Sequence, residues 1–516
     1  MFVHMRNDER TVRFIGLNLF IFFSAIYLLT YSGPSNVDTN RMRMEVARSL
    51  VERGDAAVPG GTGIRGVDGR DYSWFGIGSV LMALPVHIIG KFSGISPESL
   101  FDLIVLLIGV ATVVLVFLFS SSLGYSSRAA LFTAIFYGLG TMAWRFSKDS
   151  QDHGIETFFI LLSVYYMSRH VMSKRVMHLI FSAFFLGTAF ITRPNAVLVM
   201  PSLFILMILY YVKEYDFKTG LRLITRNVVF FSLSFLPFLG IVLWYNYYRF
   251  GSVFETGFGL TAKRLGVDFF TGTPFLTGLV GFLASPGQGF FYYSPVAVLF
   301  FFSIRSFSKK YPVHALCFVL IILSYLLFYS KNLFWHGDST WGPRYLFAIT
   351  PFLIIPAAEL FDSPVAAKKY FKLLVSILFA ISLIIQLAGI SVHRTAYWHY
   401  LVSEEHVKLD RLSGDGVQPI VYPPSECYFD WHSSSIRNQF KFVHRMIGNL
   451  IEYTHVHPSK ETLTAEKTKL EPGMYVFDFW WVYMYFIECS YSGFIVALLL
   501  LIISMFSATR IWKAVR

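Results

Sequence analysis

The sequence VDTNRMRMEVARSLVERGDAAVP (37–59) follows closely on the first apolar segment of the chain. At 100° per residue, one narrow arc of this stretch is charged and the opposite side is apolar. The charged arc consists of Arg41, Glu45, Arg48 and Glu52. This pattern predicts an amphipathic helix that lies on a membrane surface.

Asp38 stands at the first turn of that helix, where the chain has just left the bilayer. Asp is a favoured N-cap residue, and its charge suits the positive end of a helix, so a capping role is one interpretation. A chemical role is the other, because the head group of a lipid-linked substrate would lie at the same level.

The composition indicates a polytopic membrane protein. Of the 516 residues, 55% are hydrophobic and only 15% are charged, which excludes a soluble globular protein. The net charge of +12 is dispersed in short clusters between apolar runs, so it reports membrane topology rather than nucleic-acid binding. The three cysteines imply neither a disulfide framework nor a zinc site.

Apolar runs near twenty residues long predict about twelve transmembrane helices, the first of them retained rather than cleaved as a signal. The predicted spans are 14–31, 99–121, 129–145, 154–171, 177–192, 195–212, 227–248, 288–304, 312–330, 344–361, 371–392 and 479–506.

The apolar stretch 74–90 is short and contains Pro85 and His87. If it crossed the membrane, every later basic cluster would move outside, against the positive-inside rule. We therefore predict a second surface or re-entrant element within one long first outer loop, 32–98, with both chain termini in the cytoplasm.

Three regions follow from this topology. Residues 1–393 form a transmembrane catalytic module, 394–478 an extracytoplasmic region, and 479–516 the final helix with a cytoplasmic tail. The glycine-rich residues 249–274 and 281–289 interrupt helical patterns and predict a mobile or re-entrant loop. The outer segments carry most of the Asp, His, Arg and Trp residues, so the chemistry is expected on the extracytoplasmic face.

Asp149, Asp152 and His153 cluster in one outer segment. At helical spacing Asp149 shares a face with the other two. A solvated helix end is one interpretation, and binding of sugar hydroxyls is another; as a metal site the cluster is weak.

Arg193, Arg264 and Arg344 lie at or near the outer ends of predicted spans, without acids nearby in the sequence. A single arginine of this kind usually snorkels to the interface. Because three arginines lie on the same face of the membrane, binding of a phosphate is the alternative interpretation.

The segment WHGDSTWGPRY (335–345) precedes an apolar span. Its Trp335 and Trp341 are either interfacial belt residues or stacking partners for a sugar ring or prenyl chain. Arg344, about one turn beyond Trp341, would complement a phosphate.

Five features together carry a family resemblance: an acid directly after the first span, DGRDYSWFGIGSVLMALP (68–85), the acids at 149–153, TRPN (192–195) and WGPRY (341–345). In these features the chain resembles the membrane-embedded GT-C glycosyltransferases that use lipid-phosphate sugars. It is most similar to the bacterial phospholipid-carrier-dependent enzymes of glycosyltransferase family 39, kin to protein O-mannosyltransferases and lipid A aminoarabinose transferases. The resemblance covers residues 14–360 and implies an all-α polytopic membrane protein of the GT-C type.

Carried over by position, the resemblance implies catalytic roles for three acids. Asp38 would be the general base that deprotonates the acceptor hydroxyl, and Asp149 or Asp152 a second acid that holds a sugar. Arg264 or Arg344 would hold the donor phosphate, where fixed cations stabilise the leaving group. The other candidate substrate-binding residues are Glu45, Asp71, Tyr72, His153, Arg193, Glu255, His336, Asp338 and Trp341.

The expected function is transfer of a hexosyl or pentosyl group from a polyprenyl-monophosphate carrier to a hydroxyl of a lipid, glycan or protein acceptor. The predicted location is the extracytoplasmic face of the bacterial inner (plasma) membrane. We expect no cofactor, with a divalent metal only if the donor is a pyrophosphate, and no nucleic-acid partner.

Two alternatives remain open at this point. A transporter or flippase of lipid-linked saccharides would need polar residues through the bilayer midplane, whereas here they collect at the outer span ends. A glycan polymerase or ligase with a pyrophosphate donor would keep the enzyme class and change the donor.

Overall fold

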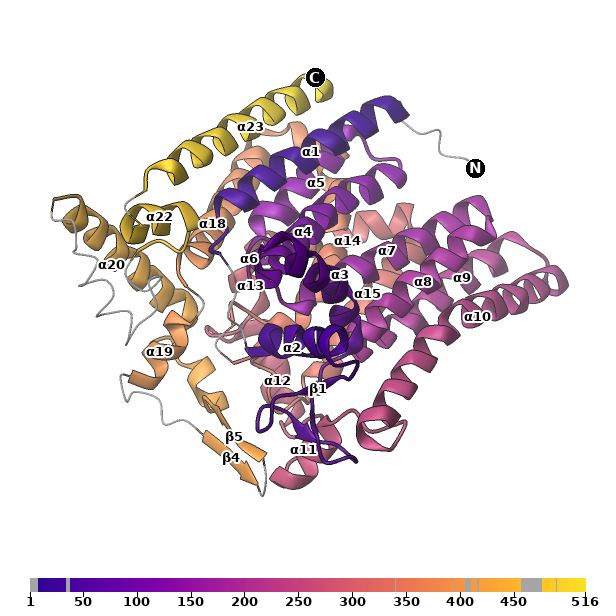
Figure 1. Cartoon of the computed structure of the whole chain (residues 1–516). Coiled ribbons are helices and arrows are strands. Elements are labelled where there is room, and N and C mark those ends of the chain that lie inside the picture. The colour runs from indigo at the N-terminus through magenta and orange to yellow at the C-terminus, as the bar shows by residue number, and fades with distance from the viewer. Residues whose placement is uncertain are drawn as a thin grey trace.

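The computed structural model describes residues 8–33, 38–338, 340–393, 395–403, 410–414, 417–455, 476–488 and 490–516. The molecule is a bundle of helices with two small sheets at one end (Figure 1). The main helices of the bundle are α1 (Glu9–Leu29), α4 (Pro97–Ser122), α5 (Ser127–Gly140), α7 (Asp152–Ser173), α8 (Val176–Thr192), α9 (Met200–Glu214), α10 (Phe217–Phe250), α14 (Leu299–Lys310), α15 (Pro312–Tyr329), α18 (Lys369–Ser391) and α23 (Ser492–Val515).

Shorter elements connect these helices. They are α6 (Ala143–Lys148), η1 (Pro194–Val199), α11 (Phe258–Leu265), α12 (Phe275–Ala284), α13 (Phe290–Tyr293), η2 (Pro295–Val298), η3 (Arg344–Ile349), α16 (Thr350–Ile354), η4 (Ile355–Ala357), α17 (Ala358–Asp362) and η5 (Pro364–Ala367).

In the described residues, eight helical segments are long and apolar enough to cross a membrane, and three shorter apolar helices accompany them. These eight account for part of the prediction of about twelve transmembrane helices. The predicted span 129–145 breaks after Gly140, and 288–304 divides into α13, η2 and α14. Residues 479–506 divide into α22 (Trp480–Glu488) and α23. The predicted span 154–171 lies within α7, which carries Asp152 in its first turn.

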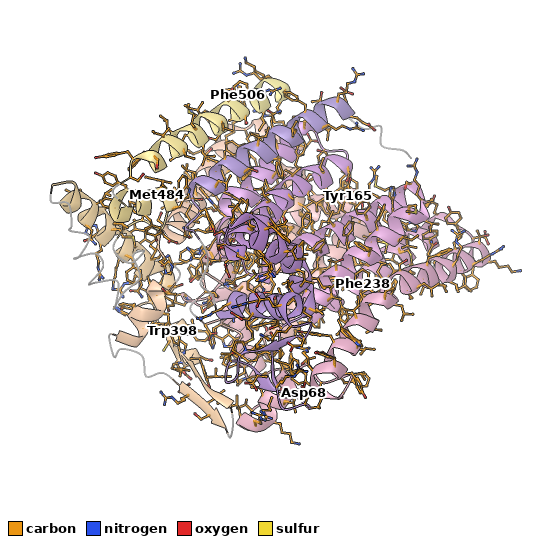
Figure 2. All side chains as sticks on the ribbon, in the orientation of Figure 1. Asp68, Tyr165, Phe238, Trp398, Met484 and Phe506 are labelled. Atoms are coloured by element: carbon orange, nitrogen blue, oxygen red, sulfur yellow. The ribbon has the colours of Figure 1, made fainter. Side chains whose placement is uncertain are left out.

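Apolar side chains cover the outside of several of the long helices (Figure 2). Phe506 on α23 is 60% exposed, and α10 and α18 present similar residues. Exposed apolar surface on this scale is typical of helices that face lipid. The multi-pass membrane character expected from composition is confirmed.

The first and last helices pack side by side, and the described chain begins and ends at the same end of the bundle (Figure 1). The guanidinium of Arg510 lies 4.8 Å from the ring centre of Phe14, which joins α23 to α1 at that end. The arrangement agrees with termini on one side of the membrane.

The first outer loop folds onto the bundle. Its amphipathic helix, predicted from residues 37–59, is confirmed as α2 (Asp38–Glu52). Val46 and Ala47 are fully buried on its apolar face, and α2 packs against α3 (Ile77–Ser93), the second predicted element of the loop. Between the two helices, β1 (Ala57–Val58), β2 (Ile64–Arg65) and β3 (Asp71–Tyr72) form an antiparallel sheet in the order β1-β3-β2.

A second group of elements follows α18. It comprises α19 (Ala396–Ser403), the antiparallel hairpin of β4 (Asp410–Gly414) and β5 (Val417–Tyr422), η6 (Ser425–Phe429) and α20 (Ser435–His455). The hairpin contacts α11, the helix inside the glycine-rich stretch 249–274 that we predicted as a loop. The elements predicted to be outer, in residues 38–72 and in the described parts of 396–455, thus gather at one end of the bundle (Figure 1).

Candidate functional site

A cavity of about 710 Å³ opens between the bundle and the outer elements. Its wall is mostly apolar and aromatic, with Ile77, Val242, Phe258, Phe269 and Phe328 among the lining residues. Seven charged side chains also line it: Arg43, Asp152, Arg193, Arg249, Arg264, Asp338 and Arg344. Five cations against two carboxylates make the cavity electropositive, which favours an anionic ligand with an apolar body.

Asp152 is the acid at the centre of this charge cluster. The chain turns sharply before it, with Ser150 at φ +51°, and α7 begins at Asp152. Nη2 of Arg43 lies 2.7 Å from Oδ2 of Asp152, and Nη1 of Arg193 lies 3.7 Å from Oδ1. A carboxylate between two guanidinium groups fixes both cations in place.

Glu156, one turn further along α7, completes the cluster. Its Oε2 lies 2.9 Å from Nε of Arg193, and its Oε1 accepts hydrogen bonds from Asn195 at 2.6 Å and from the Tyr325 hydroxyl at 2.7 Å. Arg193 is therefore held by two acids, and its guanidinium is less available to a ligand than its position suggests.

Arg344 enters the cavity from the first residue of η3. Gly342, two residues earlier, turns the chain at φ +74°, and a Cβ there would come within 2.6 Å of Met142 Sδ. Nη2 of Arg344 lies 3.6 Å from Oδ2 of Asp338 and donates to the Tyr345 hydroxyl at 3.2 Å. Its buried Nε has no hydrogen-bond partner among the described residues. One edge of this guanidinium is thus open to an acceptor.

Arg264 and Arg249 line the cavity without a carboxylate partner. In the described part of the chain, no ion pair or hydrogen bond engages the side chain of Arg264, the seventh residue of α11. Arg249 packs 3.7 Å from the ring centre of Tyr245 and donates to the Ser73 carbonyl and to Asn246 Oδ1. Arg264 is therefore the cation least committed to the protein.

His153 also lines the cavity, edge-on to Phe146 and Tyr345. Burial, and then the positive charges of Arg193, Arg344 and Arg43, hold the pKa of His153 well below its usual range. The ring is neutral and can accept or donate a hydrogen bond to a polar ligand.

The structure brings together six of the candidates named from the sequence. Asp152, His153, Arg193, Arg264, Asp338 and Arg344 all line the one cavity. The helix α2 begins at Asp38, but its side chain lies outside the described part of the structure, so the role predicted for it stays a prediction.

Four candidates are engaged in local structure and do not line the cavity. Glu45 pairs with Arg48 at 4.0 Å on α2, and Oδ2 of Asp71 accepts from the Gly61 amide at 2.6 Å. The Tyr72 hydroxyl donates to Asp68 at 2.7 Å. Glu255 accepts from the Gly257 amide at 2.7 Å at the start of α11.

Three more candidates are buried in packing outside the cavity. Asp149 accepts from Nε of Arg145 at 2.9 Å. His336 stacks on Tyr428 with ring centres 4.3 Å apart, and Trp341 packs edge-on to Tyr293 at 4.9 Å. Trp341 therefore lies in the protein core, away from both the lipid face and the cavity wall. The roles predicted for these seven residues stay predictions.

Sequence reasoning missed Arg43, Glu156, Asn195 and Arg249. Two of them carried a usable signal. Arg43 stands on the apolar side of the α2 helical wheel, close to Ala47, and Glu156 is an acid inside a predicted span, where an ionisable residue is costly without a function. Asn195 carried no signal beyond its place in TRPN.

In the described residues no group of three or more His, Cys, Asp or Glu side chains is placed to hold a metal ion. Asp152 and Glu156 each form ion pairs with arginines. The chemistry that this arrangement suits is the binding of a phosphate by guanidinium groups beside an apolar channel.

Comparison with known proteins gives one family match. Residues 86–240 match the family model PMT_2, described as dolichyl-phosphate-mannose-protein mannosyltransferase. The match runs from α3 to α10 and includes Asp152, Glu156 and Arg193, and it covers just under a third of the chain. It confirms the resemblance to lipid-phosphate-dependent glycosyltransferases that the sequence motifs indicated, and this is the class of enzyme to which the chain is similar. No curated protein matched the chain.

Two solved structures align with the chain. ArnT from Cupriavidus metallidurans, bound to undecaprenyl phosphate, is 15% identical with a TM-score of 0.49, over 96% of this chain and 77% of that one. The oligosaccharyltransferase of Archaeoglobus fulgidus, in its apo form, is 14% identical with a TM-score of 0.45, over 79% of this chain. The chain spans about three fifths of that archaeal protein, at 61%.

Proposed function

We propose that this protein transfers a sugar from a polyprenyl-monophosphate carrier to an acceptor hydroxyl. The observation that carries the proposal is the cavity, in which arginines with unused hydrogen-bonding capacity face an apolar wall. A lipid phosphate has these two properties, an anionic head and a long apolar chain. The family match over residues 86–240 supports the same donor class.

Arg264 and Arg344 are the residues we assign to the donor phosphate. Arg264 has no partner among the described residues, and Arg344 offers its Nε edge. Arg43 is already paired with Asp152, and Arg193 with Glu156. We therefore assign them no direct bond to the phosphate; they contribute positive charge to the cavity. Guanidinium groups beside the phosphate stabilise its negative charge as the anomeric bond breaks.

Asp38 is the residue we assign as general base. It begins α2, the helix whose Arg43 reaches the cavity. The base removes the acceptor proton while the acceptor oxygen attacks the anomeric carbon and the polyprenyl phosphate leaves, so the configuration inverts. The acceptor is a hydroxyl of a lipid, glycan or protein on the extracytoplasmic face.

The donor class is tested with purified protein and synthetic short-chain donors. One series carries the sugar on a monophosphate and the other on a pyrophosphate, each with and without EDTA. We expect turnover of the monophosphate series, insensitive to EDTA. Turnover of the pyrophosphate series alone, lost with EDTA, would establish the polymerase or ligase alternative in its place.

A further inference from the structure

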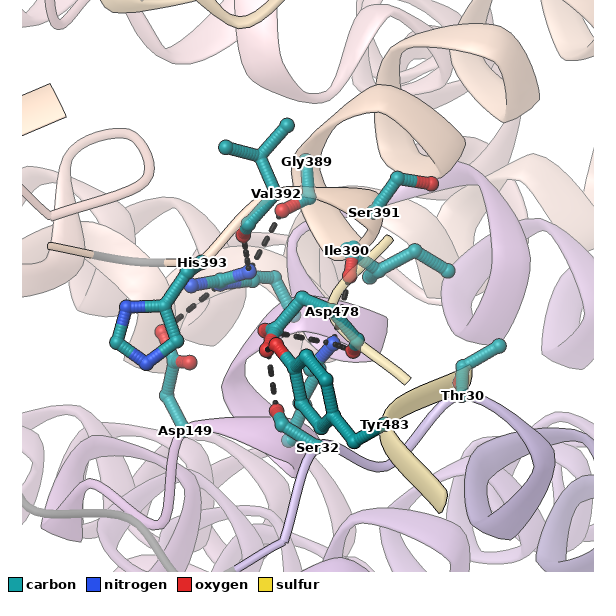
Figure 3. A network of polar contacts seen from close by, with 12 residues as sticks. Thr30, Ser32, Asp149, Gly389, Ile390, Ser391, Val392, His393, Asp478 and Tyr483 are labelled. Carbon is teal, nitrogen blue, oxygen red and sulfur yellow. Dashed lines mark hydrogen bonds and ion pairs between the residues drawn. The ribbon is translucent and has the colours of Figure 1, made fainter. Parts of the chain in front are cut away.

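A buried polar network lies at the turn between α6 and α7, just before the cavity residue Asp152 (Figure 3). Nζ of Lys148 lies 3.0 Å from Oδ2 of Asp478, and both side chains are at most 3% exposed. Lys148 also donates to the Ile390 carbonyl at 2.6 Å. Neither Lys148 nor Asp478 lines the cavity, so the network is separate from the site itself.

The same carboxylate binds the end of the first helix. Ser32 Oγ donates to Asp478 Oδ2 at 3.1 Å, and the neighbouring Trp480 amide donates to the Tyr31 carbonyl at 2.8 Å. Ser32 stands six residues before Asp38, at which α2 begins. Asp478, from the C-terminal part of the chain, thus contacts both Lys148, which precedes α7, and Ser32, which precedes α2.

The C-terminal end of α18 closes the network. Arg145 pairs with Asp149 at 2.9 Å and donates to the carbonyls of Gly389 at 2.6 Å and Val392 at 3.0 Å. Carbonyls at a helix C-terminus lack partners within the helix and attract cations. The α6–α7 turn is therefore clamped between α18 and the segment that carries Asp478.

We propose that Asp478 is a positioning residue of the transferase site, which sets the placement of Asp152 and of the start of α2. The proposal rests on the proposed function. It assigns a catalytic consequence to residues 476–480, which the family match does not reach. A purely structural anchor would affect stability alone, whereas a positioning residue changes turnover in a folded protein.

The test removes both buried charges together. Asp478→Asn alone would leave Lys148 charged and unpaired, which is strongly destabilising, whereas Asp478→Asn with Lys148→Met leaves no orphan charge. We expect the double variant to melt within a few degrees of the parent. Its kcat should fall on the order of 10- to 100-fold, because small misplacements of reacting groups are costly. The donor KM should stay within about twofold, because Arg264 and Arg344 lie on other elements.

Hydrogen exchange gives a readout that does not need activity. In the double variant the amides of residues 148–153 and 28–33 should exchange faster, while those of α15 should not. Asp362→Asn is the matched control. Asp362 accepts a hydrogen bond from Ser126 Oγ at 2.6 Å, just before the N-terminus of α5, which is the end of that helix opposite to α6. That variant should keep the parent kcat.

Two outcomes overturn the proposal: a double variant with the parent kcat, or one that loses kcat only together with its melting temperature and donor binding. A parent that uses no lipid-phosphate sugar would contradict the proposed function instead. In that case unchanged exchange at 148–153 would still overturn the assignment of Asp478 as the residue that holds this turn.

Discussion

Nη2 of Arg43 on α2 lies 2.7 Å from Oδ2 of Asp152 at the first turn of α7, and both side chains are buried. The two residues are 109 positions apart in the sequence. The pair attaches the surface helix of the first outer loop to the bundle, directly at the cavity. The position of α2 is therefore linked to the acid cluster.

Arg43→Met tests this link. The variant removes one of the two guanidinium groups from Asp152, and we expect it to lose on the order of 1–3 kcal/mol of stability and at least about tenfold in turnover. The measurement is thermal unfolding in detergent beside the transfer rate. Arg48→Gln, on the exposed side of the same helix, is the control. It should leave the stability unchanged and change the transfer rate by less than about twofold. Equal effects of the two substitutions would contradict a special role for Arg43.

Arg344→Lys and Arg264→Lys test how the donor phosphate is held. An ammonium is a point charge and cannot fork across two phosphate oxygens, so each variant should weaken donor use by about 1–3 kcal/mol. Arg193→Lys should chiefly lower stability, because Arg193 already pairs with Glu156. The readout is the dependence of rate on donor concentration. If Arg344→Lys uses the donor as well as the parent does while another variant loses donor use, then that other arginine binds the phosphate.

His336 makes stability depend on pH. Burial lowers its pKa from 6.5 to about 4, and its Nδ1 accepts a hydrogen bond from the Asp338 amide, which requires the unprotonated ring. The unfolded chain takes up this proton near pH 6.5 and the folded chain only near pH 4. Stability is therefore full above pH 6.5 and falls as pH drops toward 4, by about 3 kcal/mol in all.

Melting temperatures at pH 7.5 and 4.5 measure this effect. The difference between them should be smaller in His336→Phe than in the parent, while His432→Gln, an exposed histidine, should leave it unchanged. The same pH difference in the parent and in His336→Phe would show that other groups titrate in this range.

The orientation in the membrane is open to cysteine labelling. We expect the basic loops near residues 174, 222, 309 and 369, and both termini, to face the cytoplasm. Cysteines placed there should resist an impermeant reagent in intact cells, and one placed at Asp68 in the outer loop should react. Labelling of the basic loops from outside would move the cavity to the cytoplasmic face.

Local patterns in the sequence were sufficient for several parts of the fold. The period of the charges in 37–59 predicted α2, and apolar runs predicted most of the long helices. The breaks within 129–145 and 479–506 were missed. At the first of them a contact made across the fold replaces a helix hydrogen bond. The Met142 amide donates to Ser294 Oγ, 152 residues away in the sequence, where α5 ends and α6 begins.

Those residues of the candidate site that stand at the ends of predicted spans could be predicted from the sequence. Arg193, Arg264 and Arg344 were expected at outer span ends, and the structure brings them to one cavity. The pairing of Arg43 with Asp152 depends on how α2 docks against α7, and no local pattern encodes that contact. Arg145 and Asp149 form an i,i+4 pair, which spacing alone could predict, whereas the bond from Arg145 to the Gly389 carbonyl, 244 residues away, has no local signal.

In the mechanism we propose, the cavity takes a polyprenyl-phosphate sugar and Asp38 activates the acceptor. The most direct measurement compares donor binding and sugar transfer in the parent and in Asp38→Asn, which keeps the capping capacity but cannot accept the proton. We predict equal donor binding and a transfer rate lower by roughly 100-fold or more. Transfer by Asp38→Asn at the parent rate would rule out Asp38 as the base, and a parent that neither binds nor uses the donor would rule out the proposed donor.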